Sequence, residues 1–267
     1  MPSRPDLSVV VPAYAEAALI VPSLRAIADH VAGRPIEVIV VVAEGGDDTL
    51  ELARQCAPWF EQYRVIDAGP RRGKGRDVRL GMLAARGRYR MFMDTDLATP
   101  LHHLDELSAF MAADAAVVIG VRNLWHTHRE LHRRLVTSGG NLLVRMLLLP
   151  GLRDTQCGFK MFRAEVCETL FRNASIDGWG FDLEVLAAAR RRGYLIETLR
   201  IDDWSDPKAT ALGLGGDDVG AAARQVLRDL VRLRFDAWMR PGARFGTGSD
   251  VPAMRTPPEV LLHEGHV

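Results

Sequence analysis

Residues 36–44 read IEVIVVVAE and lack the alternation of apolar and polar side chains that a half-exposed strand shows. An unbroken apolar run rich in β-branched residues is typical of a strand buried on both faces, as in a parallel sheet. Residues 7–14, LSVVVPAY, form a second run of this kind, and residues 16–32 between them carry apolar side chains at helical spacing. The three segments predict a β-α-β unit.

The same alternation continues to residue 120. It predicts strands at 63–67, 89–94 and 115–120, and helices near 48–57, 75–86 and 101–112. Strands that alternate with helices of this length indicate right-handed crossovers and an α/β fold with a doubly wound, mostly parallel sheet. The chain has neither GxGxxG after the first strand nor GxxxxGK[ST], which disfavours a dinucleotide fold and a P-loop.

The rhythm changes after residue 120. We expect a polar loop at 121–132, a short strand that ends the segment 150–163, a strand at 194–201, and helices at 133–148, 164–172, 181–192 and 216–239. Residues 1–240 are predicted to form a single domain, with a nucleotide-binding half (1–120) and an acceptor half (121–240). Residues 241–267 are rich in Pro, Gly and Thr and predict a loosely ordered tail.

Composition narrows the class of protein. The 34 basic and 34 acidic residues balance, which gives no reason to expect a nucleic-acid partner. Three cysteines without metal-ligand spacing favour reduced thiols and a cytoplasmic location. No apolar run reaches the ~18 residues of a spanning helix, so we expect any membrane contact to be peripheral. The run LLVRMLLL (142–149) favours the core or a partner interface, such as a homodimer, over a bilayer surface.

MDTDLATP (93–100) places Asp94 and Asp96 at the end of a buried strand, where ligands bind in such sheets. Alternation along an extended segment would send both side chains the same way. Two neighbouring carboxylates suit Mg²⁺ or Mn²⁺, which typically take one or two carboxylates plus phosphate oxygens. In the alternative interpretation, Asp96 or Thr99 caps the next helix.

Five segments occur in an order and spacing that is specific as a set: SVVVPAYAE, RRGKGRDVRLGMLAARGRYRMFMDTDLATP, GVR, RDTQCGFKMFR and GWGFDLEVLAAARRRGY. From residue 7 to about 208 the chain resembles the family-2 inverting glycosyltransferases, and most of all the dolichyl- and polyprenyl-phosphate glucosyl- and mannosyltransferases. The resemblance implies a nucleotide-diphospho-sugar transferase (GT-A) fold. It also implies a divalent metal held by Asp94 and Asp96, and transfer of a hexose from a UDP-glucose or GDP-mannose type of donor.

The donor is expected at the carboxyl edge of the sheet. There the predicted donor-binding residues are Pro12, Tyr14, Glu16, Glu44, Lys74, Asp94 and Thr95, and the resemblance adds Asp154 and Lys160 of DTQCGFK as residues that line the sugar pocket. Lys74 lies between two glycines at a helix start and can bind phosphate by charge and backbone N–H, while the alternative is a solvated basic turn. The resemblance also assigns Gly158 the task of letting the chain turn.

The acceptor residues follow from the resemblance alone. A polyprenyl phosphate would meet Arg122 of GVR, then Arg134 and Ser138, which share one helical face. In the alternative interpretation, Arg134 belongs to an ordinary exposed arginine pair, RR. The resemblance makes Asp182 of FDLE the base or acceptor-facing carboxylate, and Lys208 of WSDPK a basic residue that closes over the diphosphate. Asp96, Asp182 and Lys208 are thus the predicted catalytic residues.

Two departures from the family pattern leave the donor open. Relatives end the second strand with DDGS, whose aspartate recognises the nucleobase or ribose, whereas this chain has VAEGGDD, in which Val42 and Ala43 cannot accept a hydrogen bond through their side chains. The usual YNE is YAE, with Ala15 in place of the amide. A small or specialised-metabolite acceptor, or a non-catalytic sugar-nucleotide-binding relative, stays as an alternative.

Overall fold

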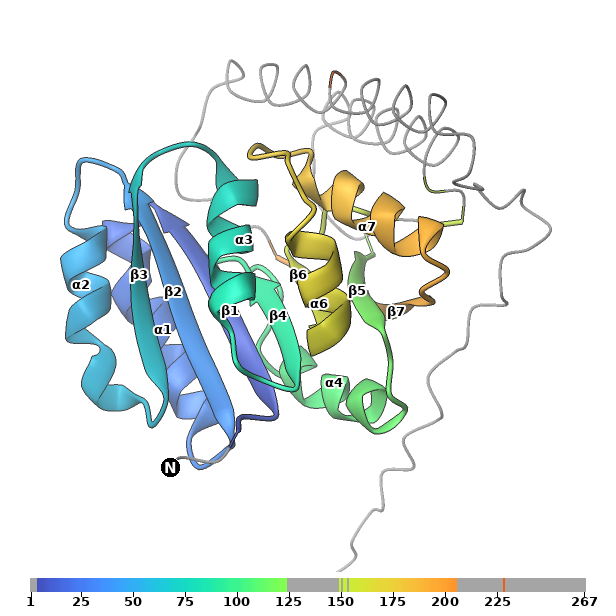
Figure 1. The fold of residues 1–267 in the computed structure, drawn as a ribbon. Coiled ribbons are helices and arrows are strands. Elements are labelled where there is room, and N and C mark those ends of the chain that lie inside the picture. The colour runs from blue at the N-terminus through green and yellow to red at the C-terminus, as the bar shows by residue number, and fades with distance from the viewer. Residues whose placement is uncertain (1–3, 124–148, 150, 153, 206–227, 229–267) are drawn as a thin grey trace, which may run out of the picture.

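The computed structural model describes residues 4–123, 149, 151–152, 154–205 and 228. Within these residues seven strands form one sheet in the order β3-β2-β1-β4-β6-β5-β7 (Figure 1). The strands are β1 (Leu7–Tyr14), β2 (Ile36–Glu44), β3 (Tyr63–Pro70), β4 (Tyr89–Met93), β5 (Val117–Arg122), β6 (Phe159–Arg163) and β7 (Ile196–Ile201). The predicted α/β class with a mostly parallel sheet is confirmed.

The sheet departs from a purely parallel one at a single strand. β6 runs antiparallel to both β4 and β5, while β1–β2, β1–β4, β2–β3 and β5–β7 are parallel. The sequence predicted a short strand in this segment but not its place between β4 and β5. The strand order reverses between β1 and β4, and that switch point is where ligands bind in open α/β sheets.

Helices cover both faces of the sheet. They are α1 (Ala17–Val31), α2 (Thr49–Gln55), α3 (Lys74–Ala84), α4 (His103–Ala112), α6 (Ala164–Phe171) and α7 (Phe181–Arg191), with a 3-10 turn η1 (Ala57–Trp59) after α2. One core layer joins α3, α6 and α7 to Val10, Ile39 and Phe92 of the strands. Helices α1 and α4 pack against the alternate residues of the same strands on the opposite face.

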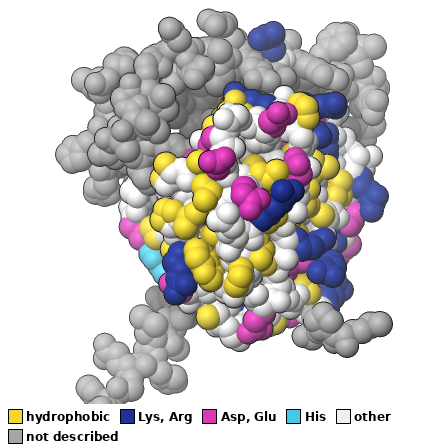
Figure 2. Space-filling view, turned by 90° about the vertical axis from the view of Figure 1, so that its left-hand side faces the viewer, with side chains coloured by type: hydrophobic (Ala, Val, Ile, Leu, Met, Phe, Trp, Pro, Cys, Tyr) yellow, Lys and Arg dark blue, Asp and Glu magenta, His cyan; other side chains and the backbone are white. Residues whose placement is uncertain are grey.

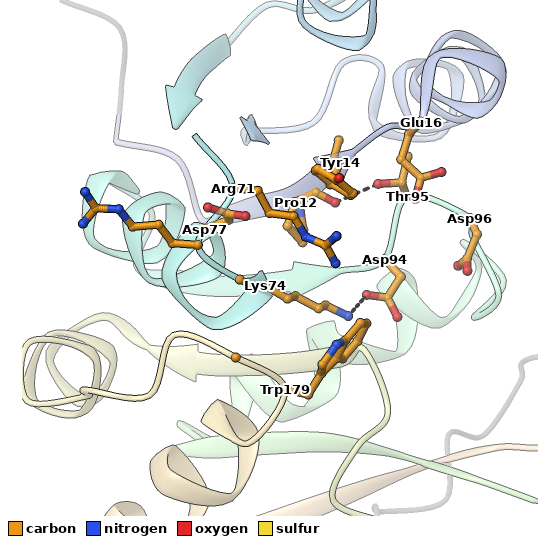
Figure 3. A pocket seen from close by; sticks show the side chains of 14 residues that line it. Pro12, Tyr14, Glu16, Arg71, Lys74, Asp77, Asp94, Thr95, Asp96 and Trp179 are labelled. Carbon is orange, nitrogen blue, oxygen red and sulfur yellow. Dashed lines mark hydrogen bonds and ion pairs between the residues drawn. The ribbon is translucent and has the colours of Figure 1, made fainter. Parts of the chain in front are cut away.

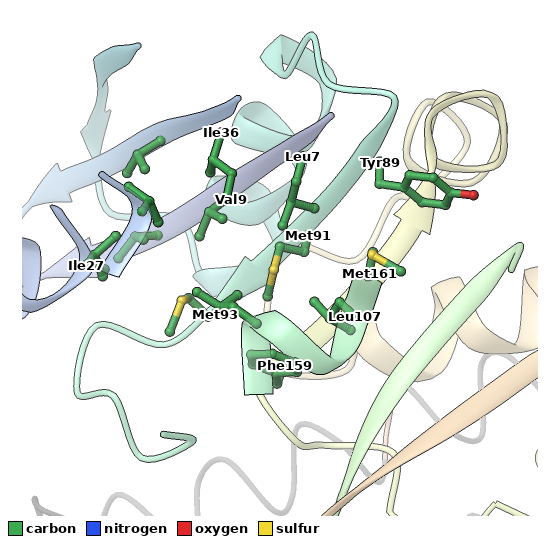
Figure 4. Close-up of a cluster of buried hydrophobic side chains, with 14 of the residues drawn as sticks. Leu7, Val9, Ile27, Ile36, Tyr89, Met91, Met93, Leu107, Phe159 and Met161 are labelled. Atoms are coloured by element: carbon green, nitrogen blue, oxygen red, sulfur yellow. The ribbon is translucent and has the colours of Figure 1, made fainter. Parts of the chain in front are cut away.

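Figure 4 shows part of this second layer, where side chains of β1, β4 and β6 meet the two helices. Val9, Met91 and Met161 are fully or almost fully buried beside Ile27 of α1 and Leu107 of α4. Since β1, β2 and β4 bury both of their faces, the unbroken apolar runs of the sequence have their physical explanation here.

Several predicted elements lie outside the described residues. These are the helices at 133–148 and 216–239, most of the loop 121–132, and the tail 241–267. Of the apolar run 142–149, only Leu149 is described, and it is buried in the core. The division into two halves stays a prediction. Cys56, Cys157 and Cys167 are free, buried thiols, as expected.

The described helices include none that is long and apolar enough to cross a membrane. On the face formed by α2 and the edge strand β3, hydrophobic side chains gather between acidic and basic ones (Figure 2). Trp59 of η1 is one of the exposed large apolar residues, and the Arg25 guanidinium lies 5.3 Å from the centre of its ring.

Candidate functional site

The ends of β1 and β4 are tied together at the switch point of the sheet. The Thr95 hydroxyl donates a hydrogen bond of 2.8 Å to the carbonyl oxygen of Pro12, and Thr95 is buried. This contact fixes the turn after β4 against the last residues of β1. The two predicted donor-binding segments therefore share one edge of one rigid sheet.

Asp94 and Asp96 lie in a turn, and not on the extended segment that the sequence suggested. β4 ends at Met93, the N–H of Leu97 bonds to the carbonyl of Asp94 at 3.4 Å, and Leu97 has a φ of 51°. The Asp96 carboxylate accepts the Ala98 N–H at 3.1 Å, which closes the turn. Helix α4 begins only at His103, so neither Asp96 nor Thr99 caps it and that alternative is wrong.

Lys74 is the first residue of α3, and its ammonium forms a close ion pair with Asp94 (Figure 3). Burial alone would lower the pKa of Lys74, but the carboxylates of Asp94, Asp182 and Asp96 outweigh it and raise that pKa above its ordinary value of 10.5. Lys74 therefore carries a positive charge beside the turn formed by residues 94–96, which we call the DTD turn. The alternative of a solvated basic turn is wrong for this residue, whose side chain is 19% exposed.

A second charge pair lies behind the first. Lys160 on β6 is 1% exposed, and its ammonium lies 2.8 Å from Asp182 of α7 and 2.5 Å from the Cys157 carbonyl. Burial raises the pKa of Asp182, and the ammonium groups of Lys160 and Lys74 oppose that rise. Asp94, Lys74, Asp182 and Lys160 thus form a row of alternating charge that runs from the turn into the core.

Arg122 and Asp154 form a third pair, although one was predicted for the acceptor and the other for the donor. The guanidinium donates from Nε to Oδ2 at 2.6 Å and from Nη2 to Oδ1 at 3.0 Å. Burial alone would raise the pKa of Asp154, but Arg122 lowers it. The side chain of Arg122 also faces the ring of Trp204, with 5.2 Å from Cζ to the ring centre.

A cavity of about 560 Å³ opens where β1, β4 and the start of α3 meet (Figure 3). Of the predicted site residues, it is lined by Pro12, Tyr14, Glu16, Lys74, Asp94, Thr95 and Asp96. Glu44, Asp154, Lys160 and Asp182 are not in its wall. A volume of this size suits a small-molecule ligand.

Four further charged or aromatic side chains in the wall were not predicted: Arg71, Arg72, Asp77 and Trp179. Arg71, Arg72 and Asp77 belong to RRGKGRD, and Trp179 belongs to GWGFDLE. Both motifs were noted in the sequence, but these four residues were not assigned to the site. Arg71 lies over Tyr14, with 4.1 Å from Cζ to the ring centre, and Lys74 lies 5.2 Å from that of Trp179. Trp179 is 47% exposed, which is unusual for a residue of this size.

The glycines near the site serve chain packing. A Cβ on Gly73 would lie 2.4 Å from the Asp177 carbonyl oxygen, and one on Gly75 would lie 2.6 Å from that of Ile176. They let the segment before α7 approach α3, rather than opening the backbone to a ligand as the sequence suggested. A Cβ on Gly158 would meet the Asp94 carboxylate, so this glycine makes room for a side chain and is not needed for a turn.

The DTD turn can supply two carboxylate ligands to a divalent cation, and a bound phosphate would have to supply others. Asp94 and Asp96 both face the cavity, and no third acidic, histidine or cysteine side chain joins them within the described part of the chain. Mg²⁺ and Mn²⁺ accept this arrangement when phosphate oxygens fill the remaining positions. His102, His103 and Asp203 form a separate cluster, in which His103 also pairs with Glu106, so these side chains hold one another.

Three predicted residues lie outside the described residues: Arg134, Ser138 and Lys208. Their roles stay predictions. Asp47, which belongs to the segment VAEGGDD that stands where relatives have DDGS, accepts the N–H groups of Ala17 and Thr49 and the Thr49 hydroxyl. It therefore serves the ends of α1 and α2.

Comparison with known proteins agrees with this geometry. Residues 8–171 match the family model described as Glycosyl transferase family 2. The dolichyl-phosphate beta-glucosyltransferase of Drosophila melanogaster is 34% identical over 215 residues, which cover 73% of this chain and 64% of that protein. ALG5D of Trichomonas vaginalis, also a dolichyl-phosphate beta-glucosyltransferase, is 28% identical over 248 residues, 87% of this chain and 75% of that protein.

Two other matches extend the range. Glycosyltransferase AglD of Haloferax volcanii is 34% identical over 232 residues, 84% of this chain but only 36% of that protein. Among solved structures, glucosyl-3-phosphoglycerate synthase from Mycobacterium tuberculosis, in complex with Mn²⁺, UDP-glucose and phosphoglyceric acid, superposes with a TM-score of 0.65 at 20% identity. That match covers 86% of this chain and 80% of the other, and it shows the shared GT-A fold.

Proposed function

Because the chain belongs to glycosyltransferase family 2, we propose that this glycosyltransferase moves glucose from UDP-glucose to a polyprenyl phosphate, with inversion at the anomeric carbon. The observation that carries the proposal is the Lys74–Asp94 ion pair in the wall of the cavity. In this proposal, Lys74 would give the diphosphate of a nucleotide sugar a cation, and Asp94 would give the metal a carboxylate ligand.

Charged side chains would bind the metal and the diphosphate at this end of the site. Asp94 and Asp96 would hold Mg²⁺ or Mn²⁺, which supplies positive charge to the leaving diphosphate. Lys74 adds an ammonium at the N-terminus of α3, where the helix dipole also favours an anion. Lys208 is proposed to close over the same group. Trp179 offers an exposed aromatic face beside Lys74, against which the hexose can pack.

The transfer step forms a bond between an oxygen of the acceptor phosphate and the anomeric carbon as the bond to the β-phosphate oxygen breaks. The acceptor oxygen is already anionic, so no base has to remove a proton. Arg122 is proposed to bind this phosphate through Nη1, since Asp154 takes Nε and Nη2, and Arg134 with Ser138 would complete the site. Asp182 then acts by holding Lys160 and Lys74 in place.

A small acceptor with a hydroxyl group is the second candidate. Its oxygen would have to lose a proton. Asp182, which the resemblance assigns as a base, has a pKa that burial raises toward that task. The two acceptors therefore predict different effects of Asp182→Asn. Transfer to a hydroxyl would lose its base, whereas transfer to a phosphate would keep a residual rate.

The test is a transfer assay with UDP-glucose and GDP-mannose, a short-chain polyprenyl phosphate or phosphoglycerate as acceptor, and Mn²⁺ or EDTA. We expect glucosylation of the lipid phosphate from UDP-glucose that needs the metal and is lost in Asp96→Ala. Asp6→Ala, which removes an exposed carboxylate at the opposite edge of the sheet, serves as the control. Turnover that is equal in Asp96→Ala and the wild type would exclude the metal role of the DTD turn.

A further inference from the structure

A carboxylate stands in the cavity wall that neither the metal nor the phosphates require. Asp77 is in the first turn of α3, and its side chain is 6% exposed. Figure 3 shows it beside Pro12 and Arg71, which line the same cavity. No residue in the described part of the chain donates a hydrogen bond to its buried Oδ1, and the nearest cation, Arg76, is 3.6 Å away.

An unsatisfied buried carboxylate costs free energy, and proteins rarely keep one without use. Burial raises the pKa of Asp77, and the guanidinium groups of Arg76 and Arg71 only partly oppose that rise. Among the described residues this oxygen therefore has an ion-pair neighbour but no hydrogen-bond donor, and a ligand could provide one. The ligand group must be a hydrogen-bond donor, because an ionised carboxylate only accepts.

The position of α3 over the sheet indicates which part of a ligand would contact Asp77. A Cβ on Gly81 would touch Val10 and Val41, so Gly81 lies directly over β1 and β2. Asp77 is one helical turn earlier, which moves it toward the carboxyl ends of both strands, beside Pro12 and Ala43. Ala43 shares the α3 face of the sheet with Val10 and Val41. Glu44, the last residue of β2, is exposed and is not in the cavity wall, so the carboxylate at this end of the cavity comes from the helix above the strand.

We propose that Asp77 is the nucleobase-recognition residue of the donor site and accepts the N3–H of uracil. The proposal rests on the proposed function and names the residue that selects its donor. Arg71, held over the Tyr14 ring, is on the same side of the cavity and can donate to a carbonyl oxygen next to N3. Lys74 and the DTD turn lie farther along the same wall, where the diphosphate of one nucleotide would follow its base (Figure 3).

The test measures binding of UDP, CDP, GDP and pyrophosphate, each with Mn²⁺, to the wild type and to Asp77→Asn by calorimetry. Asparagine keeps the shape of the side chain, but its neutral amide oxygen accepts the N3–H of uracil more weakly than a carboxylate does, and its NH₂ group can donate to N3 of cytosine, which is an acceptor. We expect UDP to bind about tenfold or more weakly, the preference for UDP over CDP to shrink by a similar factor, and pyrophosphate to bind as before. Asp177→Asn removes a neighbouring charge outside the cavity wall and should leave all four affinities unchanged.

Thermal unfolding without ligand separates recognition from a structural role. Because no described residue donates a hydrogen bond to Oδ1 of Asp77, we expect Asp77→Asn to unfold at the same temperature as the wild type or higher. A clear drop in that temperature, or an unchanged ratio of UDP to CDP affinity, would overturn the assignment. Tighter binding of GDP than of UDP by the wild type would overturn the choice of uracil, and absence of all nucleotide binding would overturn the proposed function itself.

Discussion

Gly158 and Asp94, 64 positions apart in sequence, are packed so closely that a Cβ atom on Gly158 would lie 2.0 Å from Oδ2 of Asp94. Because it has no side chain, the glycine of DTQCGFK lets the carboxylate of Asp94 pack directly against its backbone. Lys74 holds the same carboxylate through the ion pair. The motifs DTQCGFK and RRGKG therefore both contribute a residue that orients the Asp94 carboxylate.

Gly158→Ala should inactivate the enzyme while leaving it folded. The added methyl group forces the Asp94 side chain to rotate, which moves the carboxylate away from Lys74 and from the metal position. We expect kcat/KM to fall about 100-fold, since a misplacement of about 1 Å at a catalytic site can cost that much. We also expect weaker Mn²⁺ binding in a titration.

Gly87→Ala is the control for this change. A Cβ there would lie 2.5 Å from the Tyr89 carbonyl oxygen, at the opposite edge of the sheet. It should lower the melting temperature but leave Mn²⁺ affinity unchanged. Normal Mn²⁺ affinity in Gly158→Ala would show that the packing of Asp94 against Gly158 does not position the carboxylate for the metal.

Lys160 and Asp182 should be strongly coupled in stability. Either single change, Lys160→Met or Asp182→Asn, leaves a buried charge without its partner and should cost about 3 kcal/mol. The double variant should lose less than the sum, with a coupling of about 1–3 kcal/mol from urea unfolding. The exposed pair Arg25 and Asp29 gives the comparison, with an expected coupling of at most about 0.5 kcal/mol. Additive losses at Lys160 and Asp182 would show that they do not interact.

Glu37 should make folding sensitive to acid. It is fully buried and accepts hydrogen bonds from the Ser8 hydroxyl, the Arg86 N–H and the Arg64 guanidinium. Burial alone would raise its pKa, but these donors outweigh it and lower the pKa below its ordinary value of 4.5. A carboxyl group whose pKa is lowered by folding stabilises the protein above the unfolded-state pKa, and that contribution disappears as the pH falls through the folded-state value.

Glu37→Gln should therefore cost about 2–3 kcal/mol at pH 7, and less as the pH falls below 4.5. Urea unfolding at pH 7, 5 and 3.5 measures the difference. Glu61→Gln, at an exposed position, should change stability little at any of these values. A cost that is constant with pH would mean that the charge of Glu37 does not matter.

Ala15→Asn should stabilise the protein. Ala15 has a φ of 51°, in the left-handed region that alanine enters only at a cost and that asparagine tolerates better. The residue is exposed, so the longer side chain has room. We expect a gain of about 0.5–1 kcal/mol, measured by thermal unfolding. Ala18→Asn within α1 should do the opposite and cost about 0.5 kcal/mol through lower helix propensity.

Local pattern sufficed wherever the physical cause is local. The apolar runs at 7–14 and 36–44 identified buried parallel strands, because only a strand covered on both faces can bury every side chain. The helical spacing of 16–32 likewise marked α1 to within one residue at each end. The motifs brought Lys74, Asp94 and Asp96 to one edge, because all parallel strands end on the same side.

Pairing across long sequence distances could be decided only by the tertiary structure. Nothing in the sequence shows that β6 enters between β4 and β5, that Arg122 is held by Asp154, or that Gly158 bears on Asp94. These contacts depend on how separate elements pack against each other. Asp77 illustrates the difference: its sequence context is an ordinary first turn of a helix, and only the packing of α3 over β1 and β2 buries its carboxylate beside the cavity without a donor.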